Sequence, residues 1–352
     1  MYLPGQNGGE AMRSLLFGDS NPSGRLAESW PMRYEDVPFG NSFGKCETEV
    51  YKESIFVGYR YYLTAGKKVR YPFGFGLSYT TFKYSNISLE EKDGKYIVSC
   101  EIMNTGRFDG AEVVQLYVKS PAKKTFAPLR ELRGFTKVYL KAGEQCRVEI
   151  TANKDELGYF NLAENKYVLE GGEYCFEICS DCETVKLSAT LNIISDDAKS
   201  PYSDKIFEIY RDASLDKISD EVFEEMSGVK IPALPPKKPI RLESRFSDMK
   251  STFMGTILYN SVLSVAKIDM MKAKKMPEGV ERDNKIKGAL FLERILDSNS
   301  IISMSMSAGK SFPYNFAQGF MNLSNGKLIK GAICFCKAVK APMLPRENHK
   351  EK

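Results

Sequence analysis

Histidine is almost absent from this chain, because the 352 residues contain only His349, which stands in a lysine-rich terminal stretch. A single histidine excludes the Ser-His-Asp and Cys-His arrangements, in which an imidazole acts as general base. It also excludes the zinc sites that combine two cysteines with two histidines. We therefore expect no catalysis by a histidine-activated serine or cysteine.

Long apolar runs are also missing. The longest, near residues 254–266, is interrupted by Tyr259, Asn260 and several serines and threonines. It is too short and too polar to span a bilayer. The first residues lack a basic region followed by an apolar core, so the sequence predicts no secretory signal.

Cysteine is sparse, with eight residues that do not form the framework of a small secreted module. The closest group is Cys175, Cys179 and Cys182, and two interpretations compete for it. A zinc site is one, but the spacing is not that of a zinc ribbon. Ordinary thiols on a sheet face are the other, with Cys175, Glu177 and Cys179 opposite Tyr174, Phe176 and Ile178. We expect thiols, no metal, no cofactor and a cytoplasmic location.

Composition and charge place the chain among globular proteins of two or three domains. Hydrophobic residues make up 43% and charged residues 27%, and 50 basic residues face 45 acidic ones for a net charge of +5. We find no basic cluster typical of a nucleic-acid-binding surface.

Residues 1–82 are rich in glycine and aromatic residues. Gly5, Gly8 and Gly9 predict a loop that leads into a helix, which Asn21-Pro22-Ser23-Gly24 would end. A phosphate loop is an alternative, but it requires a lysine and a serine or threonine where Glu10 and Ala11 stand. We expect a packing role.

Aromatic residues alternate with glycines in Tyr71–Tyr79 and concentrate again in Val57–Tyr62. One interpretation is a structural seam between two domains, where rings pack over a tightly turning backbone. The other is a ligand-stacking platform. We favour the seam. Six aromatic residues of this region are expected to divide into two groups, one packed on the following domain and one exposed. They are Tyr59, Tyr61, Tyr71, Phe73, Phe75 and Tyr79.

Alternating apolar and polar residues characterise residues 83–194. Tyr96, Val98, Cys100 and Ile102 share one face of a predicted strand. Asp93-Gly94 and similar turns recur at intervals suited to a sandwich of about seven strands. The pattern predicts an immunoglobulin/fibronectin III-like β-sandwich, a fold that by itself says nothing about function.

Residues 195–352 change to helical periodicity. Ser219 is expected to cap a short helix that Gly228 ends, and the prolines between 232 and 239 predict an extended linker. Four further helices are expected, on the apolar sets Phe253, Ile257 and Leu258; Ile286, Leu290 and Ile295; Phe316, Phe320 and Leu323; and Ile329, Ala332, Ile333 and Cys336. The last helix has lysines on the side opposite its apolar residues, so it could lie on a membrane surface or pack on its own domain. We expect it to pack on its own domain.

Taken in order, these motifs resemble the carboxy-terminal part of a glycoside hydrolase of family 3, a group with many bacterial β-glucosidases. The resemblance rests on Leu3–Ala11, Leu16–Leu26, Val57–Tyr62 and Tyr71–Ser85. It continues through Asn104-Thr105-Gly106, Val113–Val118 and Leu132–Phe135 into the fibronectin-like module of that family. The tail resembles, more loosely, a helical extension of some bacterial members.

The resemblance implies that the catalytic residues are elsewhere. Retaining glycosidases need two carboxyl groups about 5–5.5 Å apart. In the family, the nucleophilic Asp lies in an amino-terminal barrel and the acid/base Glu lies upstream of the segment matching Leu3, so neither has a counterpart here. Asp19, Asp36 and Glu53 are expected to be surface carboxylates, and Leu63 stands where the family usually has an Asp. We predict no catalytic, cofactor-binding or metal-binding residues.

The fold class we expect is multidomain α+β. Residues 1–82 would be the remnant of the family's α/β domain with a linker, 83–194 the sandwich, and 195–352 an extended linker with a helical extension. The expected function is to support an active site of a β-glucosidase-like enzyme, with a separately encoded amino-terminal half as possible partner and a β-glucoside or oligosaccharide as substrate of the complete enzyme. The alternative is a non-catalytic carbohydrate- or protein-interaction module.

Overall fold

The computed structural model describes residues 2–41, 49–195, 198–232 and 239–337, with the backbone alone at residue 310. The chain divides into two compact units, Met1–Pro232 and Ala233–Lys352. Each unit has a core of its own.

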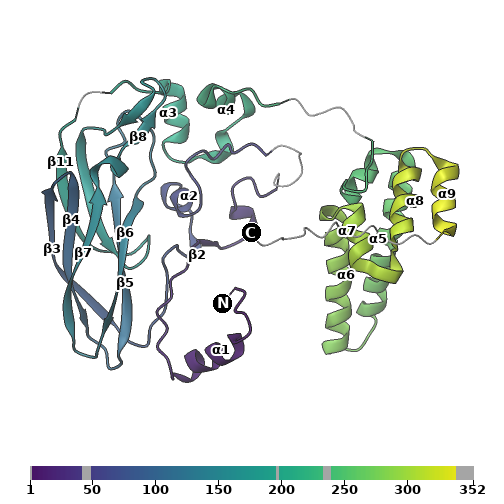
Figure 1. Cartoon of the computed structure of the whole chain (residues 1–352), viewed down its shortest axis with the longest axis horizontal. Helices are drawn as coiled ribbons and strands as arrows, with labels where there is room; N and C mark the ends of the chain where they lie inside the picture. The colour runs from purple at the N-terminus through teal and green to yellow at the C-terminus, as the bar shows by residue number, and fades with distance from the viewer. Residues whose placement is uncertain (1, 42–48, 196–197, 233–238, 338–352) are drawn as a thin grey trace, which may run out of the picture. The chain divides into compact units, whose positions relative to one another are not determined.

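Two antiparallel sheets make the sandwich in the first unit (Figure 1). The three-stranded sheet has the order β3-β4-β7, and the four-stranded sheet has the order β11-β10-β5-β6. Their bounds are β3 (Phe82–Lys92), β4 (Lys95–Asn104), β5 (Gly110–Lys119), β6 (Glu131–Leu140), β7 (Gln145–Asn153), β10 (Gly172–Cys179) and β11 (Val185–Ile193). Asp93 and Gly94 join β3 to β4 with φ of 50° and 71°, the positive values that a tight hairpin turn requires. The predicted sandwich is confirmed.

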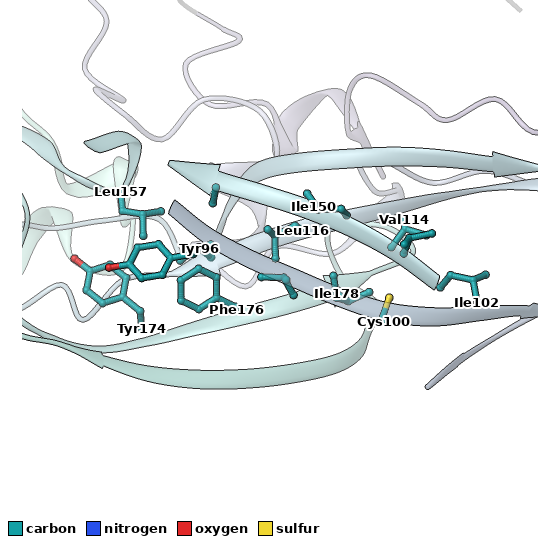
Figure 2. Close-up of a cluster of buried hydrophobic side chains, with 14 of the residues drawn as sticks. Tyr96, Cys100, Ile102, Val114, Leu116, Ile150, Leu157, Tyr174, Phe176 and Ile178 are labelled. Atoms are coloured by element: carbon teal, nitrogen blue, oxygen red, sulfur yellow. The ribbon is translucent and has the colours of Figure 1, made fainter. Parts of the chain in front are cut away.

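The core of the sandwich lies between the two sheets. Tyr96, Val98, Cys100 and Ile102 of β4 are all fully buried, as their alternation predicted. Figure 2 shows Tyr96 beside Phe176 and Tyr174 of the opposite sheet, with Cys100 and Ile102 farther along the strand. The predicted faces of β10 are also confirmed, because Tyr174, Phe176 and Ile178 belong to this core.

The described residues of 1–82, which are 2–41 and 49–82, contain short elements and no parallel sheet. Helix α1 (Gly8–Phe17) ends earlier than predicted, because Gly18 already adopts the left-handed conformation at φ 81°. Two short strands, β1 (Trp30–Pro31) and β2 (Val69–Tyr71), pair with each other. The helical turn η1 (Tyr34–Asp36) and helix α2 (Tyr59–Thr64) complete the segment.

Residues 198–232 belong to the first unit, so the predicted boundary at residue 194 does not coincide with the division into compact units. This segment forms α3 (Asp204–Tyr210), η3 (Leu215–Lys217) and α4 (Asp220–Ser227). These elements pack against Phe56, Tyr61, Tyr62 and Phe126. Ser219 caps α4 and Gly228 ends it at φ 70°, as predicted. The minor elements η2 (Lys154–Leu157), β8 (Tyr159–Asn161) and β9 (Lys166–Val168) complete the unit.

The second unit is helical. Its elements are η4 (Phe246–Ser251), α5 (Phe253–Lys274), α6 (Val280–Ser298), α7 (Ile301–Ala308), η5 (Gly309–Ser311), α8 (Tyr314–Ser324) and α9 (Leu328–Cys336). They surround a core with Phe246, Phe312 and Phe320 at its centre. Helix α7 was not predicted; Ser300 caps it by accepting a hydrogen bond from Ser303 N at 3.1 Å. Among the residues described, no helix is long and apolar enough to cross a bilayer.

The predicted packing face of α9 is wrong. Ile329 and Ile333 are 80% and 57% exposed, whereas Gly331 is buried against Leu323 and Phe335 packs on the core. The helix approaches α8 closely through its glycine, which leaves the larger side chains outside. Most of the predicted proline linker lies outside the described residues.

Candidate functional site

Three aromatic rings join residues 59–73 to the sandwich. Tyr59 of α2 stacks on Phe73 with ring centroids 4.7 Å apart, and it meets Tyr117 of β5 edge-on at 6.0 Å. The Tyr59 hydroxyl accepts a hydrogen bond from Leu132 N at 2.9 Å. Burial raises the pKa of the Tyr59 and Tyr117 hydroxyls. Tyr117 is fully buried and Tyr59 and Phe73 are half-buried, so these three rings form a structural seam, whereas Tyr71 and Tyr79 of the same aromatic stretches are 36% and 48% exposed.

Gln115 of β5 fixes the glycine-rich loop beside this stack. Its Nε2 donates to the backbone oxygens of Gly74 at 3.2 Å and Ser180 at 2.7 Å, while its Oε1 accepts from the Tyr117 hydroxyl at 2.9 Å. Gly74 has φ of +81°, and a Cβ there would collide with the Gln115 side chain. Glycine is therefore required at residue 74 for two independent reasons.

Asn21 and Arg25 attach the amino-terminal segment to the sandwich. Asn21 donates to the backbone oxygen of Asp109 at 2.9 Å and accepts from Tyr79 N at 2.8 Å. Arg25 pairs with Glu112 of β5 at 2.6 Å, and their side chains are only 12% and 7% exposed. A buried pair of this kind fixes geometry, because either charge alone would lack compensation.

The roles of Gln115 and Glu112 were not predicted from the sequence. The available signal was a polar residue within or beside the apolar run Val113–Val118, since a buried polar side chain needs a hydrogen-bond partner. Nothing local indicates that the partners would be Gly74 and Arg25.

The aromatic residues of this segment differ in exposure. Tyr59 packs on Tyr117 of the sandwich, as expected for the packed group, whereas Tyr61 is 7% exposed and packs with the helices α3 and α4. Tyr71 and Tyr79, by contrast, are 36% and 48% exposed.

A broad set of large apolar side chains in residues 2–79 is exposed. We call these residues the uncovered surface: Tyr2, Leu3, Met12, Leu16, Phe17, Trp30, Met32, Tyr34, Tyr51, Ile55, Val57, Tyr71, Leu77 and Tyr79. Leu16 and Phe17, at the end of α1, are 69% and 78% exposed. Scattered apolar side chains are normal on a protein surface, whereas a large contiguous apolar patch marks an interaction surface.

Among the residues described, two of the candidate carboxylates, Asp19 and Asp36, form ion pairs with arginines. Asp19 pairs with Arg13 at 2.8 Å, and Asp36 pairs with Arg33 at 3.3 Å. Glu53 is half-buried. Leu63 packs beside Cys179 and Cys182 in the seam, where a carboxylate would be costly.

The cysteine group has the chemistry of buried thiols. Burial raises the pKa of both Cys179 and Cys182 to about 12, so both are protonated at neutral pH. In the part of the chain that is described, no group of three or more His, Cys, Asp or Glu residues is arranged to hold a metal ion. His349 lies outside the described residues.

Comparison with known families agrees with this geometry. The family model described as "Glycosyl hydrolase family 3 C-terminal domain" matches residues 1–79, and that described as "Fibronectin type III-like domain" matches residues 112–182. Residues 1–79 therefore match a domain found at the carboxy-terminal end of family 3 glycoside hydrolases. The seam joins these two domains.

Curated relatives of this chain include thermostable β-glucosidase B of Acetivibrio thermocellus, 40% identical over 199 residues, which cover 55% of this chain and 26% of the relative. The exo-α-(1→6)-L-arabinopyranosidase of Bifidobacterium breve is 38% identical over 206 residues, covering 58% and 27%. The chain spans about a quarter of the length of these relatives.

Solved structures give the same result. β-Glucosidase 3B from Thermotoga neapolitana, in complex with glucose, is 37% identical with a TM-score of 0.50, over 53% of this chain and 27% of that one. The Bifidobacterium adolescentis GH3 β-glucosidase is 35% identical with a TM-score of 0.52, over 56% and 30%. The likeness to family 3 enzymes therefore extends over about half of this chain.

Proposed function

We propose that this chain supports and completes the active site of a β-glucosidase-like family 3 enzyme, whose catalytic carboxylates are supplied by a separately encoded amino-terminal half. The observation that carries the proposal is the uncovered surface, which lies on the segment that matches the family's carboxy-terminal domain. An apolar surface of this density gains free energy when a partner covers it, at roughly 25 cal/mol for each Å² buried.

The substrate of the complete enzyme would be a β-glucoside or an oligosaccharide cleaved at its non-reducing end. Two relatives that carry different names, a β-glucosidase and an arabinopyranosidase, match at similar identity, so this part of the protein does not choose the sugar. The proposed partners include neither nucleic acid nor membrane. A cytoplasmic location is supported by the free thiols of the described cysteines.

The experiment is complementation. An amino-terminal half from A. thermocellus β-glucosidase B, ending where its likeness to this chain begins, is mixed or co-expressed with the full chain. We expect each protein alone to leave an aryl β-glucoside intact, because neither alone presents a complete site. The mixture is expected to form a one-to-one complex by light scattering and to hydrolyse the glucoside. No complex and no turnover would refute the proposal, as would turnover by this chain alone in a preparation proven free of contaminating enzyme.

The second candidate is a non-catalytic interaction module. It is favoured by a cavity in the first unit whose lining combines aromatic and charged side chains. This function requires no amino-terminal half.

A further inference from the structure

A cavity of about 510 Å³ lies where the connection after β5 meets the segment before α2 and the strand β8. Its size is within the range of small-molecule sites in proteins, about 300–1,000 Å³. The cavity belongs entirely to the first unit. The inference drawn from this cavity rests on the second candidate function, and its test does not require the amino-terminal half.

The polar wall of the cavity has balanced charge. Glu131 lies between two guanidinium groups, with its carboxylate 3.0 Å from Arg60 and 2.6 Å from Arg133. Glu170 also lines the cavity and accepts hydrogen bonds from the backbone N–H groups of Lys123 and Lys124 at 2.6 and 3.0 Å. The charges of the two arginines and the two glutamates cancel, so the net charge of the wall favours neither an anion nor a cation. A ligand with hydroxyl groups, which both donate and accept, finds partners on this wall.

Two donors on this wall are without a hydrogen-bond partner. The Nε–H of Arg133 and the hydroxyl of Tyr159 are buried, and neither has a partner among the residues described. A buried polar group without a partner costs about 1–3 kcal/mol, so such groups normally bind water or a ligand.

Aromatic residues form another part of the lining. Phe160 of β8 is 45% exposed and is held edge-on by Tyr167 at 5.4 Å. Tyr202 also lines the cavity and is supported from one side by Phe126, which stacks on it at 4.8 Å. An exposed ring and a half-buried ring next to paired polar groups provide contacts for both the apolar faces and the hydroxyls of a sugar ring.

We propose that this cavity binds the end of a neutral oligosaccharide, with Phe160 against a sugar ring and the Arg60–Glu131–Arg133 group bonded to its hydroxyls. Bound sugar would hold the chain on a polysaccharide or an oligosaccharide product. No covalent chemistry is involved.

The test titrates the full chain with cellobiose and follows saturation-transfer NMR and calorimetry, with glucuronate as the charged comparison. We expect saturable binding of cellobiose and weaker binding of glucuronate. Phe160→Ala should weaken cellobiose binding about 2- to 10-fold, the effect of losing one aromatic contact. Glu131→Gln leaves the wall net positive, so cellobiose should bind more weakly and glucuronate more tightly than to the native chain.

The matched control is Phe108→Ala, which removes a 60% exposed ring that lines a different cavity of the same unit. It should leave cellobiose binding unchanged, and melting curves verify that each variant is folded. The proposal is overturned if cellobiose does not bind, if Phe108→Ala weakens binding as much as Phe160→Ala, or if the native chain prefers glucuronate. Because the amino-terminal half is absent from this experiment, its outcome is separate from that of complementation.

Discussion

At the scale of single residues, Gly74 shows how one backbone position joins two domains. Its positive φ and its closeness to Gln115 both exclude a side chain. We predict that Gly74→Ala destabilises the first unit by about 1–3 kcal/mol, through backbone strain and loss of the Gln115 bonds. Urea unfolding followed by the fluorescence of Trp30, the single tryptophan, measures this unit alone.

Gly9→Ala is the matched control for this prediction. Gly9 lies in α1 with open space around it, so alanine should be neutral or slightly stabilising, by at most about 1 kcal/mol. Equal destabilisation by the two substitutions would contradict the role given to Gly74.

The Arg25–Glu112 pair provides a second test at this scale. Arg25→Met or Glu112→Leu alone should cost about 3–5 kcal/mol, because each leaves a charge buried without its partner. The double substitution should recover most of the loss, since two apolar side chains can occupy the same space. Urea unfolding of the four proteins gives the coupling free energy. Additive losses would show that the two side chains act independently.

At the scale of elements, α3 and α4 decide where the first unit ends. They cover Phe56, Tyr61 and Phe126, so a chain ending at residue 194 would expose these rings to water. We predict that it is less stable than a chain ending at Pro232 by more than about 3 kcal/mol, since single large-to-small core changes already cost 2–5 kcal/mol.

Two point variants separate this effect from chain length. Ile206→Ala, at a side chain that is 1% exposed, should lower the unfolding free energy by about 2–5 kcal/mol. Val229→Ala, at a side chain that is 64% exposed, should change it by less than about 0.5 kcal/mol. Equal stability of the two truncated chains would show that the sandwich needs neither helix.

At the scale of the whole molecule, the uncovered surface should govern both solubility and complementation. We predict that Leu16→Glu with Phe17→Glu reduces aggregation and apolar-dye binding of the chain, and also abolishes activity with the amino-terminal half. The control is the adjacent pair Leu290 and Phe291 of α6, which are 45% and 66% exposed. Glutamates there should improve solubility without loss of complementation. Loss of activity with both pairs would argue against a specific contact at α1.

The sequence alone determined the sandwich and the cap and end of α4. These features depend on hydrophobic periodicity and on local turn chemistry, and both can be recognised from residues that are close together in the sequence. The ordered motifs also indicated family 3, and the family comparisons confirmed it.

Only the tertiary structure decided which side chains meet across long separations in sequence. Gln115 binds Gly74, Arg25 binds Glu112, and Phe126 packs with Tyr210, although no local pattern connects the members of these pairs. The outward face of α9 is a similar case, because Gly331 allows a close helix contact that outweighs the larger apolar area of Ile329 and Ile333. Packing is set by how surfaces fit in three dimensions, and that fit is not contained in the hydrophobicity of one segment.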